Sequence, residues 1–140
     1  MSESNPIHDL LEEYKDMLSP QMGGACVGPG WALVLKGMFA IIRHHIDRWN
    51  EVVRIKESVL ARGDTPLPWI AEYFAANPVD PFVDFKVVQI KSKFGGLRFY
   101  VENGDDFIRG VIAMGETLAD ATCDKCGVFP VDKCVCPKEG

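Results

Sequence analysis

The stretch DFKVVQIKSKFGGLRFYVENG, residues 84–104, decides the fold that this sequence predicts. Apolar and polar side chains alternate along it on both sides of Gly95-Gly96, which is the pattern of two antiparallel strands. Because glycine tolerates positive φ, Gly95-Gly96 is expected to form a two-residue hairpin turn of the primed type. The strands are then expected to pair as Phe94–Leu97, Lys93–Arg98, Ser92–Phe99, Lys91–Tyr100, Ile90–Val101 and Gln89–Glu102.

This register divides the hairpin into an apolar face and a polar face. The apolar face must pack against helices, because two strands alone are only marginally stable in water. Its expected members are Val88, Ile90, Ser92, Phe94, Leu97, Phe99 and Val101.

The polar face carries three cationic side chains, although the chain as a whole has a formal net charge of -5. Such a face is often solvated surface whose lysines discourage pairing with other strands. The alternative is a binding surface, on which Lys91, Lys93 and Arg98 contact phosphate groups or acidic side chains and Tyr100 stacks on a base or packs on a partner. Because Lys93 and Arg98 are expected to lie directly opposite each other, a bound anion would relieve their repulsion.

A short amphipathic helix and a long helix are expected before the hairpin. Asn5-Pro6 combines a capping residue with proline at the first helical position, and apolar residues then recur at helical spacing to about Leu18. The long helix is expected to begin at Trp31 and to stop at Gly63. The core is expected to join four residues from this helix and the hairpin: Trp31, Trp49, Phe99 and Val101.

Two further helices are expected. Residues 65–78, TPLPWIAEYFAANP, form a short helical pattern between prolines. The last helix starts near Asp105 and leads directly into Cys123. Its expected core stripe consists of Phe107, Val111, Met114 and Leu118.

Together these elements predict an α+β fold, in which helices pack on a small antiparallel β-hairpin and a C-terminal four-cysteine zinc knuckle follows the last helix. Residues 1–122 are expected to form a single helical and hairpin domain. Residues 123–140 are expected to form the zinc-knuckle appendage.

Four of the five cysteines lie in CDKCGVFPVDKCVC, residues 123–136, which allows a metal site, a pair of disulfides or a redox centre. No secretory signal and no apolar run of roughly 18 to 20 residues is visible, so we expect a cytoplasmic protein with reduced thiols. A redox centre is not favoured, because no strand–helix unit surrounds the motif. Cys-x-x-Cys-Gly is typical of a zinc knuckle, and a second cysteine pair closes a structural tetrahedral site. The expected zinc ligands are Cys123, Cys126, Cys134 and Cys136.

The rest of the sequence predicts no catalytic site. His44 and His45 are adjacent and therefore point to different sides of one helix. The stretch GGACVGPGW, residues 23–31, lacks the lysine and the serine or threonine of a phosphate-binding loop. Cys26, within this stretch, is expected to be a small buried apolar residue. We therefore expect a protein that is not an enzyme.

Several of these features occur together in one family. The Gly30-Trp31 helix start, the QIKSKFGGLRFY hairpin, the helix that follows it and the terminal cysteine knuckle resemble an uncharacterised family of small proteins from phages and bacterial mobile elements. The resemblance covers roughly residues 30–130. It implies a phage-type origin and a zinc-binding end, and it implies no activity.

Two classes of function follow from the sequence. The first is a small phage-type accessory protein that acts in the cytoplasm of a host cell by binding a host protein or a phage protein, including a counter-defence role. The second is a binding module for a nucleotide or nucleic acid that uses the basic hairpin face. The acidic net charge, to which a zinc ion with four thiolates would add about -2, disfavours non-specific nucleic-acid binding.

Overall fold

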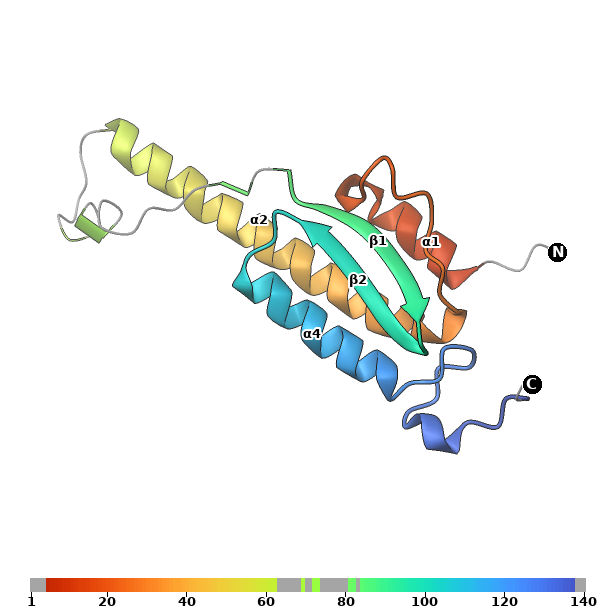
Figure 1. The fold of residues 1–140 in the computed structure, drawn as a ribbon. Helices are drawn as coiled ribbons and strands as arrows, with labels where there is room; N and C mark the ends of the chain where they lie inside the picture. The colour runs from red at the N-terminus through yellow and green to blue at the C-terminus, as the bar shows by residue number, and fades with distance from the viewer. Residues whose placement is uncertain (1–4, 63–68, 70–71, 74–80, 83, 138–140) are drawn as a thin grey trace. The chain divides into compact units, whose positions relative to one another are not determined.

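The structure, a computed structural model, describes residues 5–62, 69, 72–73, 81–82 and 84–137 (Figure 1). The chain divides into two compact units. Unit 1 comprises Met1–Ile42 and Asp84–Gly140, and unit 2 comprises Arg43–Val83. The long helix α2, Ala32–Arg62, contributes to both units.

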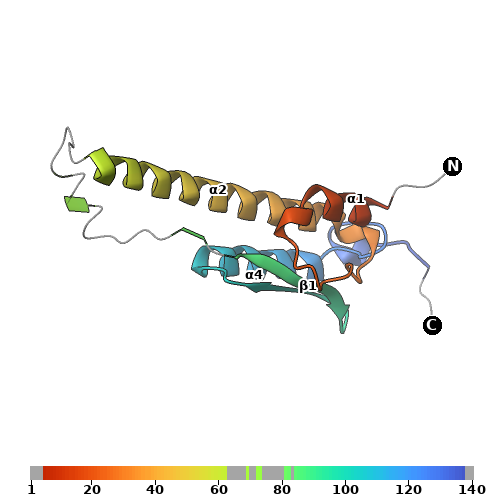
Figure 2. The same cartoon turned by 90° about the horizontal axis from the view of Figure 1, so that it is seen from above.

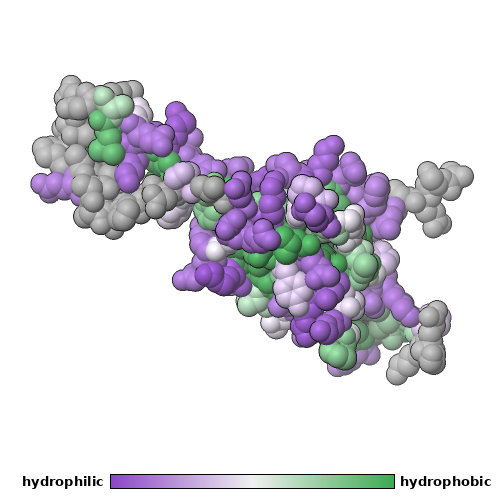
Figure 3. Space-filling view, turned by 45° about the horizontal axis from the view of Figure 1, so that its top comes forward, coloured by the Kyte–Doolittle hydropathy of each residue, from purple (hydrophilic) through white to green (hydrophobic). Residues whose placement is uncertain are grey.

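Unit 1 has the predicted α+β architecture. Figures 1 and 2 show α2 and α4 running side by side in opposite directions, packed against one face of an antiparallel hairpin, with α1 beside strand β1. The outer face of the hairpin and of α1 is largely hydrophilic (Figure 3). The elements of unit 1 besides the first part of α2 are α1 (Pro6–Glu13), β1 (Lys86–Lys93), β2 (Gly96–Glu102) and α4 (Asp106–Asp120).

The predicted helix starts are confirmed by their capping hydrogen bonds. The side chain of Asn5 accepts a 2.9 Å bond from the Ile7 N–H, and the side chain of Asp105 accepts one of 2.9 Å from the Ile108 N–H. Each bond satisfies one of the free N–H groups at a helix start. Helix α1 is shorter than expected, since it ends at Glu13 and a 3-10 turn follows it.

The predicted hairpin is present, but its predicted register is wrong. Phe94 and Gly95 form the turn, with φ of 53° and 77°, so the turn lies one residue earlier than Gly95-Gly96. Lys91 therefore lies opposite Arg98, and Lys93 lies opposite Gly96. Opposing partners change by two positions, so the strands keep their two faces although every pair differs from the expected one.

Several side chains differ from the expected apolar face, and Ser92 among them is exposed. Phe94 is 94% exposed, because it belongs to the turn and not to the strand. A bulge between Val87 and Gln89 places Val87 in the core, whereas Val88 is only partly buried. A bulge inserts one extra residue and so exchanges the faces on which the neighbouring side chains lie.

Both edges of the hairpin are covered, which explains how a sheet of two strands is stabilised. Along β1, the N–H groups of Ser19 and Cys26 donate to the carbonyls of Val87 (2.8 Å) and Ile90 (3.0 Å). On β2, the Phe99 N–H donates to the Glu116 carboxylate of α4 at 3.1 Å. The expectation that Cys26 is buried is wrong, because its backbone serves the edge of the sheet and its side chain is exposed.

Phe39 on α2 is the centre of the unit 1 core and is fully buried. Its ring stacks on Tyr14 with centroids 5.0 Å apart and meets Phe99 edge-on at 5.5 Å. Trp31 and Phe99 are buried as expected. The placement of Trp49 in the same core is wrong, because Trp49 belongs to unit 2 and is only partly buried. The expected fourth member, Val101, is also only partly buried.

The prediction of which α4 residues form the core is wrong, because a different face of the helix is buried. The buried residues of this helix are Ile108, Gly115 and Ala119. Periodicity shows that a helix has an apolar face, but it does not show whether this chain covers that face. The members of the expected stripe line an open groove instead: Phe107, Val111, Met114 and Leu118.

In unit 2, Trp49 packs edge-on against Phe82 with ring centroids 6.1 Å apart. The Phe82 N–H donates to the Asn50 side chain at 3.3 Å. The helix expected over residues 65–78 lies mostly outside the described residues. Among the residues that are described, no helix is both long enough and apolar enough to cross a membrane.

Phe39→Ala should lower the free energy of unfolding by about 3 to 5 kcal/mol, the range for an aromatic side chain removed from a packed core. Chemical denaturation followed by circular dichroism measures this loss. Leu33→Ala on the same helix is the matched control, since Leu33 is 81% exposed. If the two variants lost equal stability, Phe39 would not be the centre of the core.

Candidate metal centre and adjoining groove

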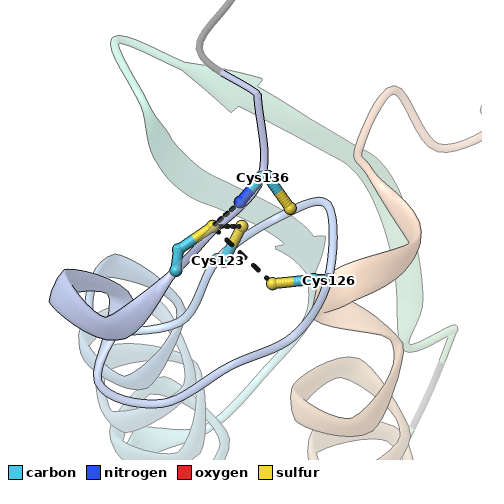
Figure 4. A group of neighbouring side chains, drawn as sticks. Cys123, Cys126 and Cys136 are labelled. Atoms are coloured by element: carbon cyan, nitrogen blue, oxygen red, sulfur yellow. Dashed lines mark hydrogen bonds between the residues drawn. The ribbon is translucent and has the colours of Figure 1, made fainter.

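The four cysteines of the C-terminal cluster converge on one point. Their Sγ atoms all lie within 4.8 Å of one another. Figure 4 shows the thiols of Cys123, Cys126 and Cys136 pointing toward a common centre. All five cysteines of the chain carry free thiols, so the structure contains no pair of disulfides here.

The spacing of the sulfurs fits a tetrahedral metal ion. Zinc–sulfur bonds of about 2.3 Å place the corners of a tetrahedron about 3.8 Å apart. The Sγ atoms of Cys126 and Cys134 are 3.7 Å apart, and those of Cys134 and Cys123 are 3.2 Å apart. Four thiolates are the donors that a soft or borderline metal prefers. The cluster is therefore suited to binding a metal ion such as zinc.

Backbone N–H groups also point at the sulfurs, as the knuckle motif predicts. The Lys125 N–H donates to the Cys123 sulfur at 3.4 Å, and the Cys136 N–H donates to the Cys134 sulfur at 3.2 Å. Gly127 has the positive φ, 79°, that this tight turn needs. Its N–H closes the turn by donating to the Cys123 carbonyl at 2.9 Å.

These contacts shift the pKa values of the thiols in opposite directions. The N–H groups of Cys126 and then Lys125 lower the pKa of Cys123 to about 6, because they stabilise its thiolate. The neighbouring Cys134 thiol, followed by Cys126, raises the pKa of Cys136 to about 12. The thiolate form is thus favoured at Cys123, and a metal ion bound by all four cysteines would have to displace the proton of Cys136.

Residues 123–136, which we call the cysteine loop, pack against the segment that starts α2. The Gly30 N–H donates to the Asp124 carbonyl at 2.7 Å, and the Trp31 indole N–H donates to the Thr122 carbonyl at 2.9 Å. A Cβ on Gly28 or Gly30 would lie 2.1 Å from a carbonyl oxygen of this loop, which no side chain can accommodate. We call Gly28–Trp31 the glycine seat.

Sequence reasoning missed the glycine seat. The sequence indicates a loop and a helix start at these glycines and excludes a phosphate-binding motif, but it does not indicate this close contact. The available signal was the Gly-Pro-Gly-Trp order itself, because closely spaced glycines mark places where two backbones approach each other. The sequence does not show which other backbone approaches.

An apolar groove lies between α2 and α4, next to the cysteine loop, and encloses about 750 Å³. Its walls include large apolar side chains that are well exposed, among them Leu33 (81%), Met114 (61%) and Phe129 (61%). We call this the α2–α4 groove. Its principal lining residues are Leu33, Gly37, Ile41, Phe107, Gly110, Met114, Leu118 and Phe129.

Two glycines inside the helices open onto this groove. A Cβ on Gly37 or Gly110 would meet no atom within 4 Å, so packing within the described residues does not require glycine at either position. Gly115 is different, since its Cβ would lie 2.3 Å from the Met38 sulfur. A glycine inside a helix costs about 1 kcal/mol relative to alanine. Gly37 and Gly110 therefore reduce helix stability and leave the groove open.

The expected binding residues of the hairpin are only partly brought together. Lys91 lies directly opposite Arg98, and its Nζ is 5.8 Å from the Tyr100 ring centroid. Lys93 instead lies over the exposed ring of Phe94 at 5.7 Å. The expected opposition of Lys93 and Arg98 is wrong, because the turn is displaced. A like-charged pair remains, but it joins Lys91 to Arg98.

No protein-family model, curated protein or solved structure matches this chain. The resemblance to small proteins of phages and mobile elements thus has no support from a family match. Of the features that carried it, the structure shows the hairpin and the C-terminal four-cysteine cluster.

Protein purified under reducing conditions should contain about one zinc ion per chain, because four thiolates close one tetrahedral site. Cys126→Ser should lose this metal, whereas Cys26→Ser, a matched control outside the cluster, should retain it. Elemental analysis of the three proteins measures both effects. Equal metal content in all three, or none in the wild type, would contradict a four-cysteine metal site.

Proposed function

We propose that this protein is a non-enzymatic binding protein and that its α2–α4 groove accepts an amphipathic helix of a partner protein. The observation that carries this proposal is the pair Gly37 and Gly110, two helix-interior glycines that open onto an apolar groove without a packing need for them. The resemblance to phage proteins makes a protein of the host cell the expected partner, in a counter-defence role.

The form of the groove favours a helix as the occupant. The groove lies between two antiparallel helices, and helices pack into such troughs at short interaxial distances when the contacting residues are small. The α4 wall from Phe107 to Leu118 extends about 16 Å at 1.5 Å per residue, which matches about three turns of a helix. Such a partner would present apolar anchors at positions i, i+3 or i+4, and i+7.

The net charge of this chain indicates which kind of partner helix the groove would favour. The chain has a formal net charge of -5, and a four-thiolate zinc site would make it more negative. Asp106 lies at the groove itself. A helix with basic residues beside its apolar face would therefore associate faster and more specifically than an acidic one. We also propose that zinc is the metal of the cysteine cluster and that its role is structural, because four thiolates leave no open coordination position.

Filling the groove tests this function. Gly110→Leu and Gly37→Leu should each fold at least as stably as wild type, since the new side chain meets open space and glycine is removed from a helix. Each should nevertheless abolish capture of the partner, because the leucine occupies the partner's position. Quantitative affinity capture from host lysate, followed by calorimetry with the captured protein, measures the loss.

Ala113→Leu is the matched control, because it adds the same side chain to an exposed position of α4 that does not line the groove. It should bind as wild type does. A partner retained by both glycine variants would contradict groove binding. Light scattering that showed a dimer of the pure protein, converted to monomer by Gly110→Leu, would mean that the occupant is a second copy of this chain.

A second candidate function rests on the hairpin. Lys91 and Arg98 face each other and Tyr100 adjoins Lys91, so the structure brings together two cations and an aromatic ring. Like charges directly opposite each other are mildly destabilising, and a phosphate group between them would relieve this effect. This favours a nucleotide or nucleic acid as the alternative ligand.

Changing Lys91, Lys93 and Arg98 together to glutamine should leave the fold intact or slightly more stable. If the hairpin binds phosphate, the triple variant should lose affinity for labelled single-stranded DNA or RNA, and the loss should shrink as salt rises. Fluorescence anisotropy at low and high salt measures this. Equal affinity of variant and wild type at low salt would show that the basic face is solvated surface only.

A further inference from the structure

We propose that the cysteine-bound metal positions one wall of the α2–α4 groove, so that binding in the groove depends on the metal. This inference rests on the proposed function, because it concerns the same groove. The link is Phe129, which lies between the two cysteine pairs in sequence and also lines the groove. Gly127, one residue after Cys126, lines the groove as well.

The loop between the two cysteine pairs, which contains Phe129, is held by backbone hydrogen bonds but buries little apolar surface of its own. The 3-10 turn Val131–Lys133 has no buried residue, and Phe129 itself is 61% exposed. Within residues 124–137 no side chain belongs to the buried core, while Cys123 just before them does. Segments with few buried apolar contacts order only when another interaction supplies the free energy. Four metal–thiolate bonds are the interaction that the cysteine cluster provides.

The ordered loop is joined to both walls of the groove. The Val131 N–H donates to the Ala121 carbonyl at 2.7 Å, which fixes the loop to the end of α4. The Gly30 N–H donates to the Asp124 carbonyl at 2.7 Å, which fixes it to the start of α2. Gly30 and Thr122 themselves line the groove. Release of the cysteine loop would therefore alter this end of the groove and not only the tail of the chain.

The consequence is a reciprocal linkage. A partner that contacts Phe129 binds the metal-loaded form more tightly than the metal-free form. By the same thermodynamic cycle, the bound partner raises the affinity of the cysteines for the metal by an equal factor. The metal centre is then a positioning element for the binding site, although it does not touch the partner.

Two-dimensional ¹H–¹⁵N spectra of the full chain, recorded with zinc bound and after chelation, test this without any partner. Backbone signals of Gly30 and Leu33 on one wall and of Leu118 on the other should shift or broaden together with those of residues 123–136. Signals of the hairpin core, such as Ile90 and Phe99, should keep their positions. Elemental analysis confirms the metal content of each sample.

Two outcomes would overturn the inference. Changes confined to residues 123–136 would show that the metal orders only the tail. Loss of the hairpin signals as well would show that the metal supports the whole fold and does not specifically position the groove.

If a partner protein has been captured, its binding to the variants and to chelated protein provides a second test. Metal-loaded Phe129→Ala should retain its zinc and the groove-wall signals of wild type, but should bind the partner more weakly. Chelation should weaken binding by wild type in the same direction. If Gly110→Leu abolishes binding while neither chelation nor Phe129→Ala affects it, the linkage fails and the groove function stands. If chelation moves the groove-wall signals but Gly110→Leu binds normally, the structural coupling stands and the proposed function fails.

Discussion

The close contact between the glycine seat and the cysteine loop is the constraint on which the rest of unit 1 depends. Gly28 and Gly30 lie against the carbonyls of Asp124 and Cys123 at a separation that excludes any Cβ. The indole N–H of Trp31 adds a hydrogen bond to the Thr122 carbonyl. The start of α2 and the end of α4 are therefore fixed to each other at one end. This contact also sets the end of the groove that runs between the two helices.

Further contacts within unit 1 hold the remaining elements together. Phe39 on α2 contacts Tyr14 at the end of α1 and Phe99 on β2 through stacked and edge-on ring contacts. The two-stranded hairpin is stabilised because backbone and side-chain groups donate hydrogen bonds to or accept them from its edges. Evolution of a stable fold alone would favour alanine at Gly37 and Gly110, since both positions have room for it. Their glycines, together with exposed Leu33 and Met114, are the observations from which we propose the groove as a binding site.

The sequence predicts those features that local chemistry determines and fails where tertiary contacts decide. Helix caps at Asn5 and Asp105 and the convergence of four cysteines follow from side-chain chemistry and spacing. The hairpin faces were predicted by alternation, but its register was not, because Phe94 adopts the positive φ expected of Gly96. The α4 stripe was predicted as core because periodicity does not identify what covers an apolar face. The glycine seat depends on a backbone segment that is 91 residues away for Trp31 and Thr122, which no local pattern reveals.

Thermal unfolding of wild type and Gly30→Ala, each with and without saturating zinc, tests the central claim most directly. A metal that binds only the native state raises its stability, and here that effect reaches α2 and α4 through the glycine seat. Zinc should therefore raise the Tm of wild type clearly and that of Gly30→Ala much less, with metal content verified in both. An equal rise in Tm for the two proteins would contradict the account, because the metal would then stabilise the core without the seat.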